Sequence, residues 1–233
     1  MPYFPKIRHE YKTPEECLAA VTKRGWELRY VPESLITSEM CLAAVKDAGW
    51  ALQRVPLKFR TLEVCIAAIR QDISVLSWPH IQDIPGIYLA AVKETGEALL
   101  RVPLERQTSE MCLIAVKDIG WALNHAREDL ITCEMCLISV KHDGMTLKYV
   151  PRRLKTLEVC LAAFKQECWA FLYVPNEYQT SELCLKAVQG DGLILHHMSQ
   201  DQKTPEICLA AILEDPDAIM YSPYSILELL SMV

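Results

Sequence analysis

Cysteine recurs at a constant interval, and this interval constrains the fold more than any other feature of the sequence. Eight cysteines, called the ladder cysteines below, follow one another at steps of 24 residues with one longer gap: Cys17, Cys41, Cys65, Cys112, Cys136, Cys160, Cys184 and Cys208. Tyr88 divides the gap into steps of 23 and 24 residues, so the chain contains nine units. A fixed period of this size is typical of repeat proteins, in which each unit contacts only its neighbours.

The first half of each unit predicts a short amphipathic helix. It reads Thr-x-Glu-x-Cys-Leu-x-Ala-Val, most clearly in the second copy, where Thr37 begins the unit. The threonines are expected to be N-caps, and Pro14 and Pro205 suit the first helical position. The glutamate faces the positive end of the helix dipole, but most copies lack the third-position acid of a capping box. Cys, Leu, Ala and Val are expected to form one apolar face. The capping threonines are Thr37, Thr61, Thr108, Thr132, Thr156, Thr180 and Thr204.

The second half of each unit predicts another short helix. A glycine is expected to end the first helix in the left-handed conformation. These glycines are Gly25, Gly49, Gly96, Gly120, Gly144 and Gly192. A leucine three residues later is expected to face inward, and Val-Pro ends the second helix because the residue before proline disfavours helix. The inward leucines are Leu28, Leu52, Leu99, Leu123 and Leu147.

Stacking of these hairpins predicts an all-α fold, a right-handed α-solenoid of nine two-helix repeats. One hairpin is too small to bury its own apolar face, so neighbours must bury it. We expect a single domain over residues 1–233, with repeats from about 13 to 223 and end caps at 1–12 and 224–233. The amphipathic tail from Ile226 to Leu230 is expected to fold back. A conventional helical bundle would not require a fixed step.

Several copies depart from the unit. The fourth has Pro85-Gly86 in place of its Thr cap and Tyr88 in place of its Cys, and it is predicted to be the least stable. The seventh carries Cys168 where a glycine is expected. The fifth and eighth lack the Val-Pro ending.

The repeated Cys-Leu-x-Ala-Val, Gly and Leu-x-x-Val-Pro elements resemble a bacterial family of short helical tandem repeats of unknown function. The resemblance covers roughly residues 13 to 223. It implies a helical repeat fold and carries over no catalytic residues. It also implies an effector-like or regulatory protein that meets other proteins, because such repeats recur in chains of that kind.

Composition and charge limit the classes of partner that are expected. The net charge of −6 provides no basic field for a phosphate backbone, so nucleic acid is not expected as a partner. No stretch of about 18 apolar residues spans a membrane, and residues 1–10 lack the apolar run of a signal peptide. We therefore expect a cytoplasmic protein, or one delivered into a host cell, whose cysteines are reduced.

A catalytic or metal-binding role is the alternative hypothesis. Cys133 and Cys136 form a Cys-x-x-Cys pair at a helix start, and His142, His196 and His197 are scattered along the chain. No second ligand pair has zinc-finger spacing, and the sequence contains no phosphate loop, His-Glu-x-x-His or Gly-x-Ser-x-Gly motif. The ladder cysteines are expected to pack in the core, since cysteine is among the most buried residue types. We expect no enzyme, cofactor or metal.

One column of the second helix is the candidate partner-binding site. Thirteen residues after each ladder position the side chain is large and amphipathic, and its type varies, unlike in the core columns. This aromatic row comprises Tyr30, Arg54, Trp78, Arg101, His125, Tyr149, Tyr173, His197 and Tyr221. Tyr, Trp and Arg are enriched at binding hot spots, so the row predicts a protein or peptide partner. The alternative is that these side chains cover the seam between helices and expose only their tips.

Overall fold

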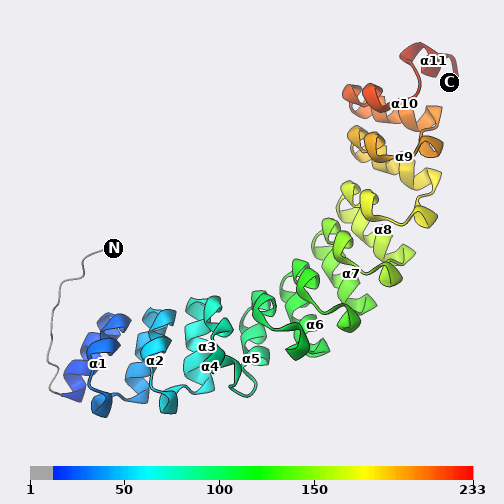
Figure 1. Cartoon of the computed structure of the whole chain (residues 1–233). Helices are drawn as coiled ribbons and strands as arrows, with labels where there is room; N and C mark the ends of the chain where they lie inside the picture. Colours follow the sequence, from blue (N-terminus) through cyan, green and yellow to red (C-terminus); the bar gives the residue numbers. More distant parts are fainter. Residues whose placement is uncertain (1–12, 233) are drawn as a thin grey trace. The chain divides into compact units, whose positions relative to one another are not determined.

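The computed structural model describes residues 13–232, and all regular elements in this range are helical. The chain divides into two compact units, here called unit 1, which ends at Gln107, and unit 2, which begins at Thr108. Figure 1 follows the elements along the chain. The α-helices of unit 1 are α1 (Pro14–Lys23), α2 (Ser38–Asp47), α3 (Leu62–Gln71), α4 (Pro79–Gln82) and α5 (Ile87–Glu94). Those of unit 2 are α6 (Ser109–Asp118), α7 (Cys133–His142), α8 (Leu157–Gln166), α9 (Ser181–Gly190), α10 (Pro205–Glu214) and α11 (Ile226–Met232).

In every repeat except the fourth a threonine caps the α-helix, as predicted. In α2 the backbone N–H of Met40 donates to Thr37 Oγ1 at 3.3 Å, and all seven predicted threonines act in the same way. Thr13 caps α1, and here Glu16 completes a capping box. The prediction that the unit has no capping box is therefore wrong for the first repeat, the one copy with Glu at the third helical position.

The second helix of each repeat is a 3₁₀ helix. These helices are η1 (Gly25–Tyr30), η3 (Gly49–Arg54), η5 (Ile73–Ser77), η6 (Gly96–Arg101), η8 (Gly120–His125), η10 (Gly144–Tyr149), η12 (Cys168–Tyr173), η14 (Gly192–His197) and η16 (Pro216–Tyr221). Gly49, Leu52 and Val55 are buried and lie three residues apart. A 3₁₀ helix has three residues per turn, so these residues lie along one side of it. The valine before proline is extended and ends the helix, as predicted.

A third, shorter turn follows the second helix in most repeats, so the repeat has more than the two predicted elements. Proline precedes many of these turns because its fixed φ suits the start of a helical turn. They are η2 (Glu33–Leu35), η4 (Leu57–Phe59), η7 (Leu104–Arg106), η9 (Glu128–Leu130), η11 (Arg152–Leu154), η13 (Asn176–Tyr178) and η15 (Gln200–Gln202). Helix α4 takes this place in the third repeat.

The repeat glycines are needed for close packing, and the predicted left-handed conformation is wrong. Among the described residues only Gly86 has a positive φ, of 75°. A Cβ built on Gly49 would lie 2.6 Å from the carbonyl oxygen of Ala68 in the next repeat. Gly25, Gly144 and Gly192 meet the equivalent carbonyl of the following repeat even more closely. The glycine therefore lets the start of one 3₁₀ helix touch the backbone of the next α-helix.

In most repeats the core is formed by four positions of the α-helix together with the inner leucine of the 3₁₀ helix. All eight ladder cysteines are buried, and so are the predicted leucines from Leu28 to Leu147. The residue before the ladder position is also buried in every repeat except the first, where it is the exposed Glu16, and the sequence analysis missed this column. These residues are Met40, Val64, Ile87, Met111, Met135, Val159, Leu183 and Ile207.

The leucine after each ladder cysteine does not belong to the core, contrary to prediction. Leu42, Leu113 and Leu137 are half-buried, and Leu161 is exposed. A helix turns about 100° per residue, so the position after the cysteine points away from the position before it. The inward face is therefore centred one residue earlier than predicted.

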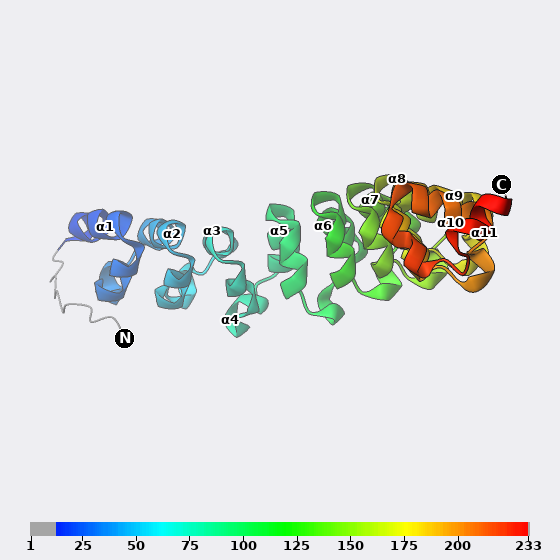
Figure 2. The ribbon, with the colours of Figure 1, turned by 90° about the horizontal axis from the view of Figure 1, so that it is seen from above.

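Each unit has two layers. In unit 1, α1, α2 and α3 lie side by side on one face, called the α face, and the 3₁₀ helices lie on the other, called the 3₁₀ face (Figure 2). In unit 2, α6 contacts α7 and α7 contacts α8, while η10 contacts both η8 and η12. The tail forms α11, which packs on α10 and buries Leu229, as predicted. The predicted N-terminal cap at 1–12 lies outside the described residues.

Candidate functional site

The aromatic row lies at the end of the 3₁₀ helices. Eight of its nine members are the last residue of a 3₁₀ helix, and Trp78 directly follows η5. Arg54, Arg101 and His197 are exposed, and Tyr30 is 36% exposed. Trp78, His125, Tyr149, Tyr173 and Tyr221 are half-buried. The row therefore borders solvent in every repeat, and more than half of its members also cover the surface beneath them.

Row members pack against neighbouring side chains of their own 3₁₀ helix. The Trp26 and Tyr30 rings meet edge to face with centroids 6.0 Å apart, and Trp121 and His125 do so at 5.6 Å. The Lys148 amine lies 4.6 Å from the centre of the Tyr149 ring. Edge-to-face contacts of this kind hold aromatic rings in defined orientations at the surface.

In unit 2 an aromatic chain crosses three repeats. The Trp169 ring of η12 contacts His197 at 5.8 Å, and His197 contacts His196 at 4.8 Å. The His196 ring then lies 4.4 Å from Tyr221 of η16. The Trp169 indole N–H also donates to Asp191 Oδ2 at 2.9 Å. The structure thus brings two row members from successive repeats, His197 and Tyr221, together through His196.

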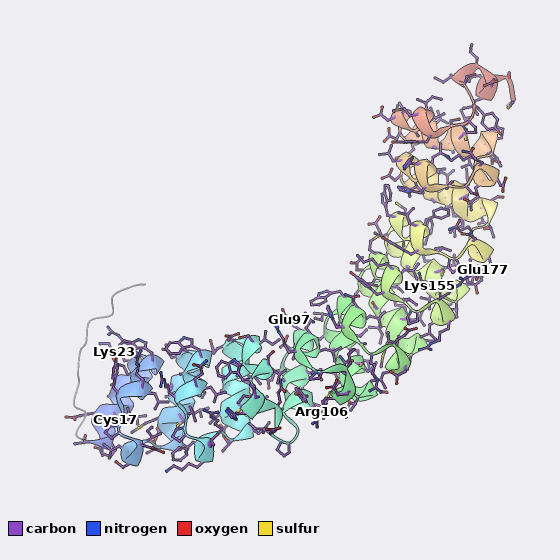
Figure 3. The ribbon with its side chains drawn as sticks, viewed as in Figure 1. Cys17, Lys23, Glu97, Arg106, Lys155 and Glu177 are labelled. Atoms are coloured by element: carbon purple, nitrogen blue, oxygen red, sulfur yellow. The ribbon has the colours of Figure 1, made fainter. Side chains whose placement is uncertain are left out.

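Two hollows border the row in unit 2. One, of about 400 Å³, is lined by Phe171, Leu172, Asn176, Gln179, His197, Ser199 and Gln202. The other, of about 380 Å³, is lined by Val150, Arg152, Lys155, Tyr173, Pro175, Asn176 and Glu177. Figure 3 labels Lys155 and Glu177, which lie near one another along one edge of unit 2. The hollows are small and partly polar, so they suit individual side chains of a partner better than a closed small-molecule site.

In five repeats a polar residue before the next capping threonine donates to the backbone at or next to the row, and the sequence analysis missed it. The Lys155 amine donates to the Tyr173 carbonyl at 3.0 Å, and Lys203 donates to the Tyr221 carbonyl at 3.0 Å. Burial lowers the pKa of Lys155. Gln179 and Arg60 donate instead to the valine carbonyl that ends their own repeat's 3₁₀ helix. These polar residues precede five of the seven predicted caps, whereas Ile36 and Ile131 precede the other two, and this spacing was a signal available in the sequence.

A column of tryptophans nine residues after the ladder position was also missed. It comprises Trp26, Trp50, Trp121 and Trp169. Trp50 is 47% exposed and Trp121 is 42% exposed. Three of the four contact the aromatic row, so the candidate surface includes both columns.

The ladder thiols are poorly suited to act as nucleophiles or metal ligands. Burial raises the pKa of Cys41, Cys65, Cys136 and Cys160 to about 11, so these thiols stay protonated at neutral pH. All ten cysteines are free, and only Cys133 is exposed. Between residues 13 and 232 no three His, Cys, Asp or Glu side chains are grouped to hold a metal ion. No helix in the same range is long and apolar enough to cross a membrane.

Comparison with known protein families gives a match to part of the chain. A domain of unknown function (DUF4116) matches residues 133–179. The matched segment begins with α7 and ends after η13, close to two 24-residue steps of the repeat. Neither the curated proteins nor the solved structures contain a match to this chain.

Proposed function

We propose that this chain is a non-catalytic scaffold, a right-handed solenoid of nine repeats, that binds a protein or peptide partner on its 3₁₀ face. The observation that carries the proposal is the aromatic chain of Trp169, His197, His196 and Tyr221 across three repeats. Tyr, Trp and Arg dominate binding hot spots, and the aromatic rings among them bury a large area with few rotatable bonds. A surface of this composition suits recognition of a polypeptide.

The backbone beneath the row supports a binding role. The Lys155 and Lys203 amines hold the carbonyls of Tyr173 and Tyr221, each from the preceding repeat. Rings held in place before binding lose less conformational entropy when a partner arrives. The row therefore offers a partner a preorganised surface.

We also propose a reducing compartment, the cytoplasm of a bacterium or of a host cell, with an effector-like or regulatory role. All ten cysteines are free thiols, and eight of them are buried in the core. Oxidative cross-linking would require these residues to leave the core. The alternative role, an enzyme or a cysteine-dependent redox or metal protein, predicts reactive thiols or bound metal in the purified protein, which thiol counting and metal analysis would detect.

The binding surface can be tested with peptides selected from a random display library on the wild-type protein. Tyr149→Ala and Tyr173→Ala should each weaken a selected peptide by more than about 1 kcal/mol, the usual threshold for a hot spot. Lys141→Ala and Lys165→Ala change the α face of the same two repeats and should leave the affinity unchanged. The opposite result, with the lysine variants losing the peptide and the tyrosine variants retaining it, would place the site on the α face.

A further inference from the structure

The α face loses its column of lysines towards the C-terminal end of unit 2. Along most α-helices a glutamate, the half-buried leucine and a lysine follow one another on the outer surface, as Glu134, Leu137 and Lys141 do in α7. The lysine column ends at Lys165, and α9 and α10 carry Gln189 and Leu213 at the same position. Lysine is depleted at interface cores, so its loss favours contact with a partner here.

A groove separates α8 from α9. Cys168 occupies the glycine column, and its Sγ lies 3.2 Å from a Cβ built on Gly190 in α9. Correspondingly, α8 and α9 contact each other much less than α7 and α8 or α9 and α10 do. The groove has a volume of about 510 Å³ and is lined by Leu157, Leu161 and Phe164 among others. The side chain at the glycine position therefore accounts for an apolar opening on the α face.

A second groove lies beside the first, on the other side of α9. It has a volume of about 660 Å³ and is lined by Leu185 of α9, Leu209 of α10 and Met232 of α11 among others. Glu182 borders both grooves. The two openings are therefore adjacent, one on each side of a single helix.

The surroundings of the second groove are acidic. The sequence contains no lysine or arginine after Lys203, whereas it contains five acidic residues, including Glu206 and Glu228. Glu206 lines the groove itself, and Glu182 pairs with Lys186 at 2.7 Å. On α11, Leu227 and Leu230 are 81% and 64% exposed. The acidic border thus belongs to the second groove, at Glu206, whereas the first groove is also lined by Lys165 and Lys186.

We infer that the α8–α11 surface binds an amphipathic helix of a partner protein, with one large apolar side chain in each groove and Lys or Arg beside Glu206. Grooves on the two sides of one helix lie about 8–10 Å apart, and seven residues of a helix span about 10 Å. Two apolar side chains seven residues apart therefore fit both grooves. A second copy of this chain fits less well, because the two acidic borders would repel each other.

This inference is independent of the proposed function, because the second groove and Glu206 share no residue with the row or its hollows; only Glu177 borders both the first groove and a hollow of the row. The probe is a labelled synthetic helix of about 15 residues, based on alanine and glutamine, with two leucines seven residues apart and lysines at one end. Fluorescence anisotropy should show saturable binding to the full chain. A peptide with glutamate in place of the lysines, and one with its leucines four residues further apart, should each bind at least about tenfold more weakly.

Two variants with matched controls locate the site. Leu157→Asp and Glu206→Lys should each weaken the basic peptide at least about tenfold, and Glu206→Lys should strengthen the glutamate peptide. Leu62→Asp and Glu63→Lys are the controls, because Leu62 and Leu157 occupy identical Thr-Leu-Glu-Val-Cys segments. Circular dichroism of each variant checks that the helices are retained.

Three outcomes would overturn the inference. The first is a lack of saturable binding by the basic peptide. The second is an equal loss of binding in the control and groove variants, which would indicate nonspecific attraction to an acidic protein. The third is a dimer in sedimentation experiments that Leu157→Asp converts to a monomer. That result would assign the surface to a second copy of this chain. The tyrosine variants of the 3₁₀ face should leave peptide binding unchanged, so this test and that of the proposed function fail separately.

Discussion

At the scale of single residues, the repeat glycines hold neighbouring repeats close together. Gly49→Ala would place a Cβ 2.6 Å from the Ala68 carbonyl oxygen, well inside normal contact distance. We expect this variant to lose about 1–3 kcal/mol of unfolding free energy, the usual cost of overpacking, although alanine is the better helix former. Urea denaturation would measure the loss.

Cys168→Ala is the control for this prediction. The position belongs to the same column and already carries a Cβ, so its stability should change by less than about 0.5 kcal/mol. Equal stability of Gly49→Ala and the wild type would mean that the repeats can separate at no cost, and close contact would then not explain the glycines.

The cysteines should differ sharply in their reaction with a thiol reagent. Cys133 is exposed, whereas the eight ladder cysteines are buried. In the folded protein Cys133 should therefore be labelled first and the ladder cysteines only slowly, because labelling of a buried thiol requires local opening. Mass spectrometry after a short pulse would identify the labelled residues, and complete labelling in denaturant provides the reference. Rapid labelling of most ladder cysteines would contradict their place in the core.

At the scale of elements, the 3₁₀ helix contributes to stability through its inner leucine. Leu123 and Leu52 are almost completely buried. Leu123→Ala should cost about 2–5 kcal/mol, the range for large-to-small changes in a core. Leu104→Ala, at a position that is 57% exposed, is the control and should cost less than about 0.5 kcal/mol. If both variants cost the same small amount, the 3₁₀ helix does not belong to the core.

The segment between α3 and α5 should open more easily than the neighbouring repeats of unit 1. Gly86 takes the N-cap position of α5 with a φ of 75° and provides no side-chain cap, unlike the threonines elsewhere. Hydrogen exchange should therefore be faster from Ile81 to Tyr88 than in α2, because each repeat holds only its neighbours. Uniform protection of these segments would show that α4 replaces the lost cap.

At the scale of the whole molecule, the buried thiols link stability to pH. The pKa of Cys41, Cys65, Cys136 and Cys160 is raised by burial to about 11 in the folded chain, whereas unfolded thiols titrate near about 8.5. Below that pH both states are protonated. Above it the unfolded chain loses protons that the folded chain keeps, so the unfolding free energy falls until about pH 11.

Urea denaturation in reducing buffer between about pH 8 and 11 would measure this loss, which is of the order of 1–3 kcal/mol per thiol. Tyrosine and lysine also titrate in this range, so the comparison with Cys160→Ala isolates one thiol. That variant should lose stability less steeply with pH than the wild type. Identical slopes for the two proteins would show that Cys160 does not contribute.

Local features were predictable because they depend on residues close together in the chain. The Thr caps, the Val-Pro ends and the buried cysteine column follow from capping chemistry, proline sterics and a fixed period, and all three are present. The candidate row could be located by the same period. Its partner remains a proposal, since residue types at a surface do not specify what binds there.

The remaining features were decided by packing between repeats. The glycine conformation and the lysines that hold row carbonyls depend on atoms about 18 to 24 residues away. The groove beside α8 likewise arises because Cys168 faces Gly190 of the next repeat. The sequence by itself determined the repeat and its local caps, whereas tertiary structure decided which faces meet, because that choice requires the spacing of neighbouring helices in three dimensions.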